Sequence, residues 1–106
     1  MDEILLPLHP DFWDLIRSGE KTIKIQKDIP RFKEYPIRVI VYICGKRCVV
    51  GKFDCCKVTK NRNGFSTIHI AKDSVIEYGA AFSLKRSTGL SDPPRDWCYL
   101  YKAGGT

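Results

Sequence analysis

The stretch "IRVIVYICGKRCVVGKFDCCKVTK", residues 37–60, decides the fold that the sequence predicts. Its first part, residues 37–43, is rich in β-branched side chains and predicts a strand near the middle of a sheet. The letters "CGKR" then indicate a hairpin turn. Residues 48–60 predict a long strand, in which Gly51 permits a bulge or a bend. We therefore expect two adjacent antiparallel strands at the centre of the fold.

The segment before this hairpin predicts a strand followed by a short helix. The apolar run at residues 4–8 is typical of a buried strand. A helix is expected over residues 10–18, because proline suits the first helical position. Within it Phe12, Leu15 and Ile16 form one apolar face that we expect to point inward.

Residues 21–27, "KTIKIQK", predict a half-buried strand with one apolar and one polar face. Ile23 and Ile25 share one face, and Lys24 and Gln26 share the other, because side chains alternate along a strand. The simplest interpretation of the polar face is a surface in contact with water.

The remainder of the chain predicts a turn, further extended structure, a helix and a last strand. Residues 61–64, "NRNG", are the clearest turn signal. Residues 65–70 read as a strand or as an extended entry to a helix, and residues 72–82 carry a helical apolar face. Residues 83–96 have no periodicity and predict a loop, whereas residues 97–102 predict the final strand.

This order of elements, β-α-β-β-β-β-α-β, predicts an α+β protein. We expect a small, mixed, mostly antiparallel β-barrel, with sequential strands antiparallel and two flanking helices. The 106 residues are enough for one domain, which we place at residues 1–106.

The charge of the chain is positive and unevenly distributed. The formal net charge is +6, and twelve of the 18 lysines and arginines fall within residues 21–62. A concentrated basic surface attracts polyanions, of which nucleic acid is the usual one in the cytosol. The alternative is a solubilising surface without a partner.

Two observations predict a cytoplasmic protein without a membrane partner. No apolar run approaches the length of a membrane span, and the first ten residues, "MDEILLPLHP", are acidic where a secretory signal would be basic. An odd number of cysteines in such a chain favours reduced thiols over disulfides. Their spacing does not suit a zinc site, so we expect no metal and no cofactor. The five are Cys44, Cys48, Cys55, Cys56 and Cys98.

Three segments together resemble the ASCH domain family, a branch of the PUA-like superfamily. They are "ILLPLHPDFWDLIRSGEKTIKIQKD" (4–28), "IRVIVYIC" (37–44) and "CVVGKFDCCKV" (48–58). The closing "PPRDWCYLY" (93–101) is similar to the end of short ASCH proteins of phages and prophages. The resemblance covers nearly the whole chain and implies a PUA-like barrel.

The family pattern after the first helix is G-x-K-x-x-E-x-R, and this chain matches it in part. Gly19 and Lys21 stand at the glycine and the lysine. Lys24 stands where an acidic residue is usual, and Gln26 stands where arginine is usual. The departures change a site that could pair with a nucleobase edge into a cationic one, which suits phosphate.

The resemblance implies binding of RNA or of modified nucleosides between the barrel and the first helix. One bacterial branch hydrolyses the acetyl amide of N(4)-acetylcytidine, and it has threonine where Lys24 stands and a glutamate on a later helix. Glu77 is the acid of this chain that could take that glutamate's place. The weak catalytic candidates are therefore Lys21, Lys24 and Glu77, since a lysine beside another cation can become a base.

The candidate binding residues follow from the same frame. We expect an anionic ligand to contact the strand, with the loop after it closing over the ligand and two aromatic rings exposed for stacking on bases. The strand residues are Gly19, Lys21, Thr22, Lys24 and Gln26, the loop residues are Arg31 and Lys33, and the aromatic residues are Trp13 and Tyr35.

Three functions stay open on the sequence. The first is an ASCH/PUA-like module that binds RNA or a nucleotide through a basic cleft. The second is a small amidohydrolase that acts on a modified nucleoside, which the missing glutamate and arginine of the pattern disfavour. The third is a phage-type inhibitor that binds a host protein or nucleic-acid complex.

Overall fold

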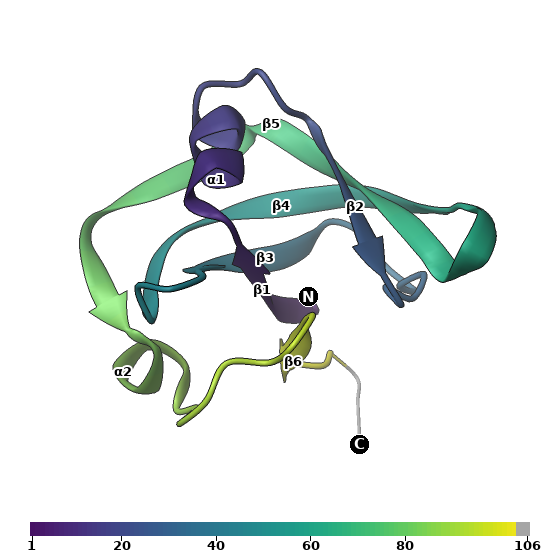
Figure 1. The fold of residues 1–106 in the computed structure, drawn as a ribbon. Coiled ribbons are helices and arrows are strands. Elements are labelled where there is room, and N and C mark those ends of the chain that lie inside the picture. The colour runs from purple at the N-terminus through teal and green to yellow at the C-terminus, as the bar shows by residue number, and fades with distance from the viewer. Residues whose placement is uncertain (104–106) are drawn as a thin grey trace.

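Six strands form one curled, mixed sheet in the computed structural model, which describes residues 1–103 (Figure 1). The α+β class and the predicted order of strands and helices are confirmed. The elements are β1 (Glu3–Leu8), α1 (Pro10–Arg17), β2 (Ile23–Lys27), β3 (Ile37–Ile43), β4 (Cys48–Lys60), η1 (Arg62–Gly64), β5 (Phe65–Ser83), α2 (Leu84–Thr88) and β6 (Cys98–Tyr101).

The strands lie in the order β2-β5-β4-β3-β1-β6. The β1–β3 pair is parallel and the other pairs are antiparallel, so the mostly antiparallel character is confirmed. The predicted β3–β4 hairpin is present, and the register of β4 against β5 shifts beside Gly51. The expectation that sequential strands pair is wrong for β2, which pairs with the start of β5. The loop between β2 and β3 buries Ile29 and Phe32, and so carries the chain across the core.

Apolar side chains cover both faces of the central strands. Ile4 and Leu6 of β1 belong to the core inside the curled sheet, whereas Leu5 belongs to a second core on the outside, with Leu84 of α2. Strands that are buried on both faces have continuous apolar sequences. This explains why β1 and β3 lack an alternating pattern.

Helix α1 forms as predicted, but it buries a different set of side chains. Pro10 occupies its first turn, and the His9 ring nitrogen Nδ1 accepts a hydrogen bond from the Asp11 amide at 3.2 Å. Ile16 is buried as expected, while Phe12 and Leu15 are half-buried. Trp13, which we expected to be exposed, is only 4% exposed. The expectation failed because the indole covers the bare backbone of Gly51, a contact made between distant segments.

The predicted helix over residues 72–82 is wrong, because this segment is the second half of the long strand β5. Its backbone pairs with β4, where Ile76 lies opposite Lys52 and Glu77 lies opposite Gly51. A glycine at position 79 disfavours a helix, and the hydrogen bonds to β4 supply the alternative.

The second helix lies instead within the predicted loop. Helix α2 begins after Ser83, whose hydroxyl accepts a hydrogen bond from the Arg86 amide at 3.2 Å, and it ends at Gly89. A serine cap and a glycine stop were the available sequence signals, but a helix of five residues is too short to show a periodicity.

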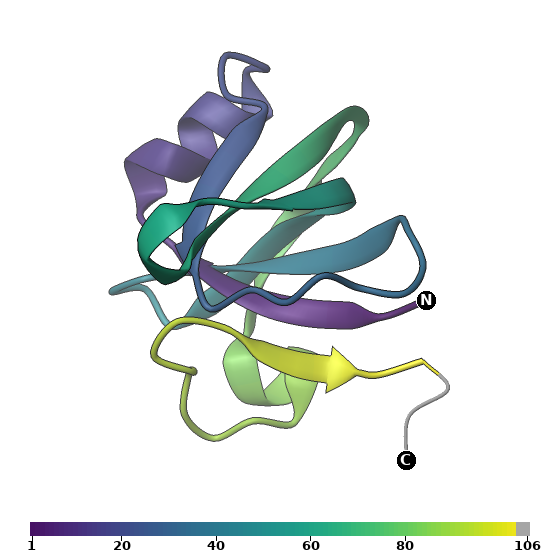
Figure 2. The same cartoon turned by 90° about the vertical axis from the view of Figure 1, so that its right-hand side faces the viewer.

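The curl of the sheet brings its two edge strands, β2 and β6, toward each other (Figures 1 and 2). The Gln26 side-chain amide donates a hydrogen bond across this opening to the Asp96 carbonyl, at 3.4 Å. The result is a half-barrel whose opening lies beside β2. Within residues 1–103, no helix has the length and the apolar character needed to cross a membrane.

Candidate functional site

Strand β2 presents its polar side chains to the interior of the half-barrel and its isoleucines to the outside. Ile23 is 42% exposed and Ile25 is 53% exposed, whereas Lys24 and Gln26 are half-buried. Lys24 lies opposite the buried Ile68 of β5, and paired residues share one face of a sheet. Lys24 and Gln26 are therefore only partly in contact with water, and they lie on the buried side of the sheet. We call these two side chains the β2 inner face.

The Lys24 ammonium is partly removed from water without an acidic partner. Its Nζ donates a hydrogen bond to the Ile25 carbonyl at 2.7 Å and lies 5.3 Å from the centre of the Phe12 ring. None of the ion pairs among the described residues includes Lys24. Burial lowers the pKa of this ammonium, since desolvation disfavours the charged form.

The other residues of the family pattern lie where the chain passes from α1 into β2. Gly19 ends the helix with a φ of +82°, in the left-handed conformation that the sequence predicts. Lys21 and Thr22 are exposed, and the Lys21 amide donates a hydrogen bond to the Leu15 carbonyl at 3.1 Å. Their exposure leaves both side chains free to reach a ligand beside β2.

Lys72 of β5 joins this region, although nothing in the sequence placed it here. Its Cε would lie 2.8 Å from a Cβ added at Gly19, so its stem crosses the bare glycine backbone. Because residues 72–82 were predicted to form a helix, Lys72 was not expected in a strand beside β2. The pairing of β2 with β5 brings Lys72 to the same end of the sheet as Lys21.

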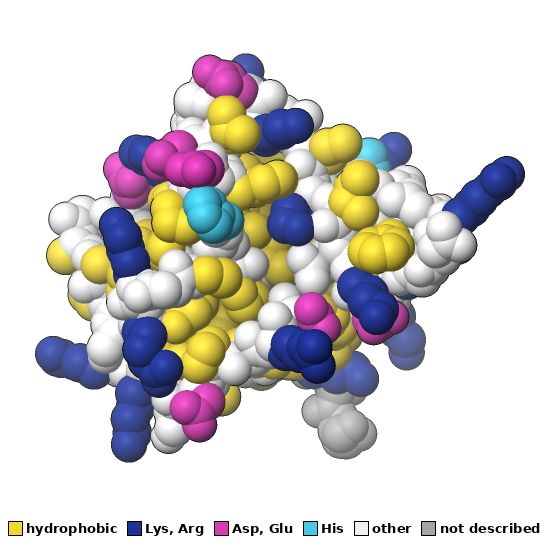
Figure 3. Space-filling model, viewed as in Figure 1, with side chains coloured by type: hydrophobic (Ala, Val, Ile, Leu, Met, Phe, Trp, Pro, Cys, Tyr) yellow, Lys and Arg dark blue, Asp and Glu magenta, His cyan; other side chains and the backbone are white. Residues whose placement is uncertain are grey.

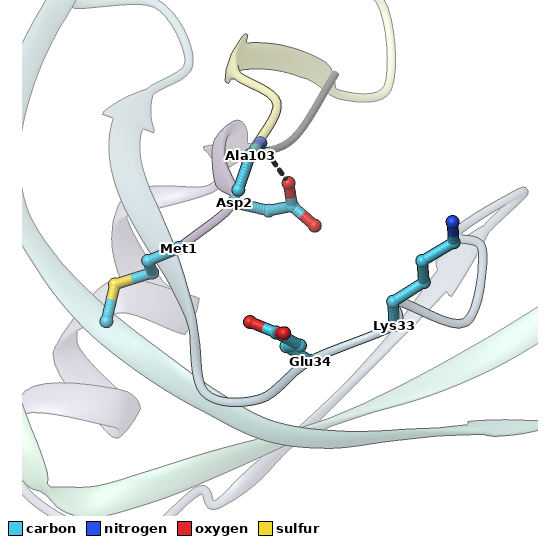
Figure 4. Close-up of a pocket in the computed structure, with 5 residues that line it drawn as sticks. All are labelled: Met1, Asp2, Lys33, Glu34 and Ala103. Carbon is cyan, nitrogen blue, oxygen red and sulfur yellow. Dashed lines mark hydrogen bonds between the residues drawn. The ribbon is translucent and has the colours of Figure 1, made fainter.

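The loop residues that we expected to close over a ligand point elsewhere or into solvent. Lys33 lines a separate pocket of about 210 Å³ between the two chain ends, where Asp2 and Glu34 are also present (Figure 4). In that pocket the Asp2 carboxylate accepts a hydrogen bond from the Ala103 amide at 2.6 Å. Arg31 is exposed, and its side chain forms no hydrogen bond with β2 among residues 1–103.

The two aromatic residues chosen for stacking are both engaged in packing. Trp13 is buried, as described above. Tyr35 is half-buried, its hydroxyl accepts a hydrogen bond from the Phe32 amide at 3.1 Å, and the two rings meet edge to face. The half-buried Phe12 ring instead lies below the Lys24 ammonium, beside the β2 inner face.

Glu77 is not brought to the lysines of β2. It lies on β5 opposite Gly51, whereas β2 pairs with β5 only as far as His69. The Glu77 carboxylate forms an ion pair at 3.0 Å with Arg17. Arg17 also pairs with Asp14 at 2.5 Å, so Glu77 belongs to a small ionic cluster at the side of α1.

Lysine and arginine side chains are spaced around the face that carries α1 and β2, with hydrophobic side chains exposed between them (Figure 3). Aspartate and glutamate side chains lie on the same face, several of them over α1, so the cationic groups are separate points among apolar and acidic ones (Figure 3). Among residues 1–103 no group of three or more metal-binding side chains is present.

The five cysteines are free thiols with different surroundings. Cys55 is fully buried, its Sγ donates a hydrogen bond to the Lys57 carbonyl at 3.2 Å, and burial raises its pKa to about 11. Cys44 and Cys56 are exposed. Because the thiolate is the reactive form, Cys55 is held in an unreactive state at neutral pH.

We therefore predict an ordered alkylation of the native protein. Iodoacetamide at pH 8 should modify Cys44 and Cys56 first and leave Cys55 untouched, as tandem mass spectrometry can show. After unfolding without a reductant all five thiols should react, because no disulfide is expected. Early modification of Cys55 in the folded protein would contradict the placement of this side chain.

The half-barrel of six strands with α1 beside its opening is the ASCH fold. The chain superimposes on the crystal structure of ASCH from Zymomonas mobilis with a TM-score of 0.70. The unaltered protein is 18% identical, with 94% of this chain and 88% of that one covered. A single-residue mutant of it gives a TM-score of 0.74 at 17% identity, with 96% and 92% covered. No family model and no curated protein sequence matches this chain.

Proposed function

We propose that this protein is an ASCH/PUA-like binding module that recognises RNA or a nucleotide at the β2 inner face. The observation that carries the proposal is the orientation of β2. A strand that contains two isoleucines and two long polar side chains would be expected to bury the isoleucines, because their burial is favourable by roughly 1.5–3 kcal/mol each. Here Ile23 and Ile25 are exposed, and Lys24 and Gln26 are turned inward.

The β2 inner face suits a phosphate with a base beside it. Lys24 provides a cation without an acidic partner among the described residues. Its partial burial strengthens the electrostatic attraction between this cation and an anionic ligand. The Gln26 amide can donate and accept hydrogen bonds, and its bond to Asp96 is long enough, at 3.4 Å, to be exchanged for one to a ligand. Lys21 and Lys72 extend the cationic surface toward the end of α1.

Hydrolysis of a modified nucleoside receives less support from the arrangement. Glu77 is paired with Arg17 beside α1, and no carboxylate of the described residues forms an ion pair with Lys24. General base catalysis requires such a group within hydrogen-bond reach of the reacting proton. Binding is therefore the function we propose.

The experiment is a titration of a fluorescent single-stranded RNA oligonucleotide at several salt concentrations. The logarithm of affinity should fall linearly with the logarithm of salt, by about 0.7 for each phosphate neutralised. Lys21→Ala and Lys24→Ala should each weaken binding several-fold and make this slope shallower. Thermal stability should change little for Lys21→Ala, because exposed lysines contribute little to folding.

Lys52→Ala is the matched control. Lys52 lies on β4 opposite Ile40, on the outer face of the sheet, and it is half-buried like Lys24. Its removal should leave both affinity and slope close to those of the parent. If the Lys21→Ala, Lys24→Ala double variant bound RNA as tightly as the parent, the proposal would be wrong.

A further inference from the structure

A second pocket, of about 410 Å³, lies on the outer side of the sheet at the ends of β1 and β3. Its walls come from the β3–β4 turn and from the segment that precedes β6. Tyr42, which lines it, shares the outer core with Leu5, so the pocket is on the face opposite Lys24. Its size falls in the range of about 300–1,000 Å³ that is typical of small-molecule sites.

Two arginines from distant parts of the sequence meet in this pocket. Arg47 is placed by the β3–β4 turn, and one of its nitrogens donates a hydrogen bond to the Ser91 carbonyl at 3.2 Å. The Asp92 carboxylate lies 3.8 Å from Arg47, beyond hydrogen-bond distance. Arg95 is exposed and takes part in no ion pair or side-chain hydrogen bond with the described residues. Most of the donors of both guanidinium groups are therefore available to a ligand.

Tyr42 adds an unused polar group. Its side chain is 3% exposed and packs among Leu5, Val49 and Leu84. Its hydroxyl forms no hydrogen bond with another described residue, and it is not one of the buried polar atoms that lack a partner, so the oxygen reaches the surface. The ring is thus held rigidly in the outer core while the residue contributes to the pocket wall.

The rest of the wall consists of three prolines and of Cys44 and Gly45 from the β3–β4 turn. Pro7, Pro93 and Pro94 line the pocket beside the two arginines. Paired guanidinium groups match the geometry of a phosphate, to which they can donate parallel hydrogen bonds. Proline rings offer flat apolar surface to an attached organic group at little cost in side-chain entropy.

We propose that this pocket binds a phosphate monoester that carries a planar organic group. Arg47 and Arg95 hold the phosphate, the Tyr42 hydroxyl donates to one of its oxygens, and the prolines contact the planar group. A free nucleoside monophosphate and the 5′-phosphorylated end of an RNA strand both present this chemistry. The site is separate from the β2 inner face, and it goes beyond the function proposed above.

The test is a titration of the ¹⁵N-labelled protein followed by NMR. The probes are uridine 5′-monophosphate, uridine, inorganic phosphate, and a short oligouridylate with and without a 5′-phosphate. Uridine 5′-monophosphate should shift the amide signals of Gly45 and Arg47, uridine should not, and inorganic phosphate should bind at the same place more weakly. If the terminal phosphate of RNA is the source, the 5′-phosphorylated oligonucleotide should bind more tightly than the mononucleotide.

Three substitutions and one control variant make the test specific. Arg47→Ala and Arg95→Ala should each weaken binding of uridine 5′-monophosphate about tenfold, because charge-assisted hydrogen bonds are lost. Asp92→Asn should strengthen it by a few-fold, since the competing carboxylate beside Arg47 is removed. Lys52→Ala, the control on the outer face of β4, should leave the shifts of Gly45 and Arg47 unchanged, because Lys52 does not line the pocket. Thermal melting checks that each variant is folded.

The outcomes separate this site from the β2 inner face. Equal binding of uridine and its monophosphate, or the absence of shifts at residues 44–47 with every probe, would overturn the proposed pocket. Loss of binding in Lys24→Ala but not in the arginine variants would also overturn it, while supporting the function proposed for β2. Loss in the arginine variants alone would support the pocket and leave the β2 proposal to its own test.

Discussion

Replacing Gly51 by alanine should destabilise the protein by roughly 3 kcal/mol, as expected for an overpacked core. A Cβ at this position would clash with the Ile76 carbonyl oxygen and lie 2.6 Å from Cζ2 of Trp13. Neither neighbour can yield easily, because the carbonyl is backbone and the indole is buried. The melting temperature should fall by about 12–24 °C, at about 4–8 °C for each kcal/mol in a domain of this size.

Gly79→Ala provides the matched control for this prediction. Gly79 belongs to β5, the strand that also contributes the Ile76 carbonyl, but a Cβ there would meet nothing within 4 Å. Its melting temperature should stay within about 3 °C of the parent, as is usual for a surface substitution. A Gly51→Ala protein that melted together with this control would show that the indole does not cover Gly51.

Lys24→Met should raise stability and weaken RNA binding, two effects of opposite sign. The methionine keeps an apolar stem against Phe12 and removes a charge that is partly buried without an acidic partner. A gain of about 1 kcal/mol, or roughly 4–8 °C in melting temperature, is expected. Affinity for single-stranded RNA should fall by about tenfold or more, since the desolvated cation supplies the phosphate contact.

Lys27→Met separates this effect from a general loss of charge. Lys27 lies on the same strand but on its outer face, and it is exposed. Lys27→Met removes the same charge as Lys24→Met, but the charge it removes is exposed to water. Stability and RNA affinity should therefore both change only a little. If Lys24→Met instead destabilised the protein, the Lys24 ammonium would stabilise the folded state, and the proposed cost of its partial burial would be wrong.

The sequence alone predicted the elements whose signals are local. The β3–β4 hairpin was predictable because β-branched and apolar residues persist through residues 37–43 and a turn follows at once. Helix α1 was predictable because Pro10 and Gly19 mark its ends. These signals depend on the backbone preferences of each residue and its near neighbours. When such local preferences agree with one another, tertiary contacts seldom override them.

The second half of β5 was not predictable in the same way. Residues 72–82 contain a helical apolar spacing as well as extended-structure formers, and Gly79 favours neither state strongly. The hydrogen bonds offered by β4 decided between the two states. Those hydrogen bonds connect residues that are about 25 positions apart, such as Gly51 and Glu77, so no local window contains them.

The candidate site was predicted as a set of residues but not as an arrangement. The pattern around Gly19 and Lys21 indicated which strand to consider, and two substituted positions, Lys24 and Gln26, suggested a cationic surface. The structure turned those two side chains inward, added Lys72, and placed Glu77 in an ion pair with Arg17.

What the sequence determined by itself is therefore the class of fold, the helix beside the opening and the identity of the polar strand. Which face of β2 points inward was decided only by the tertiary structure. The alternation of apolar and polar residues is the same in both orientations, and burial of Ile23 and Ile25 would favour the opposite one, so the strand's own sequence does not predict the orientation observed. Pairing with β5 fixes the register, in which Lys24 lies opposite Ile68 and Gln26 lies opposite Ser66, both on the buried side of the sheet.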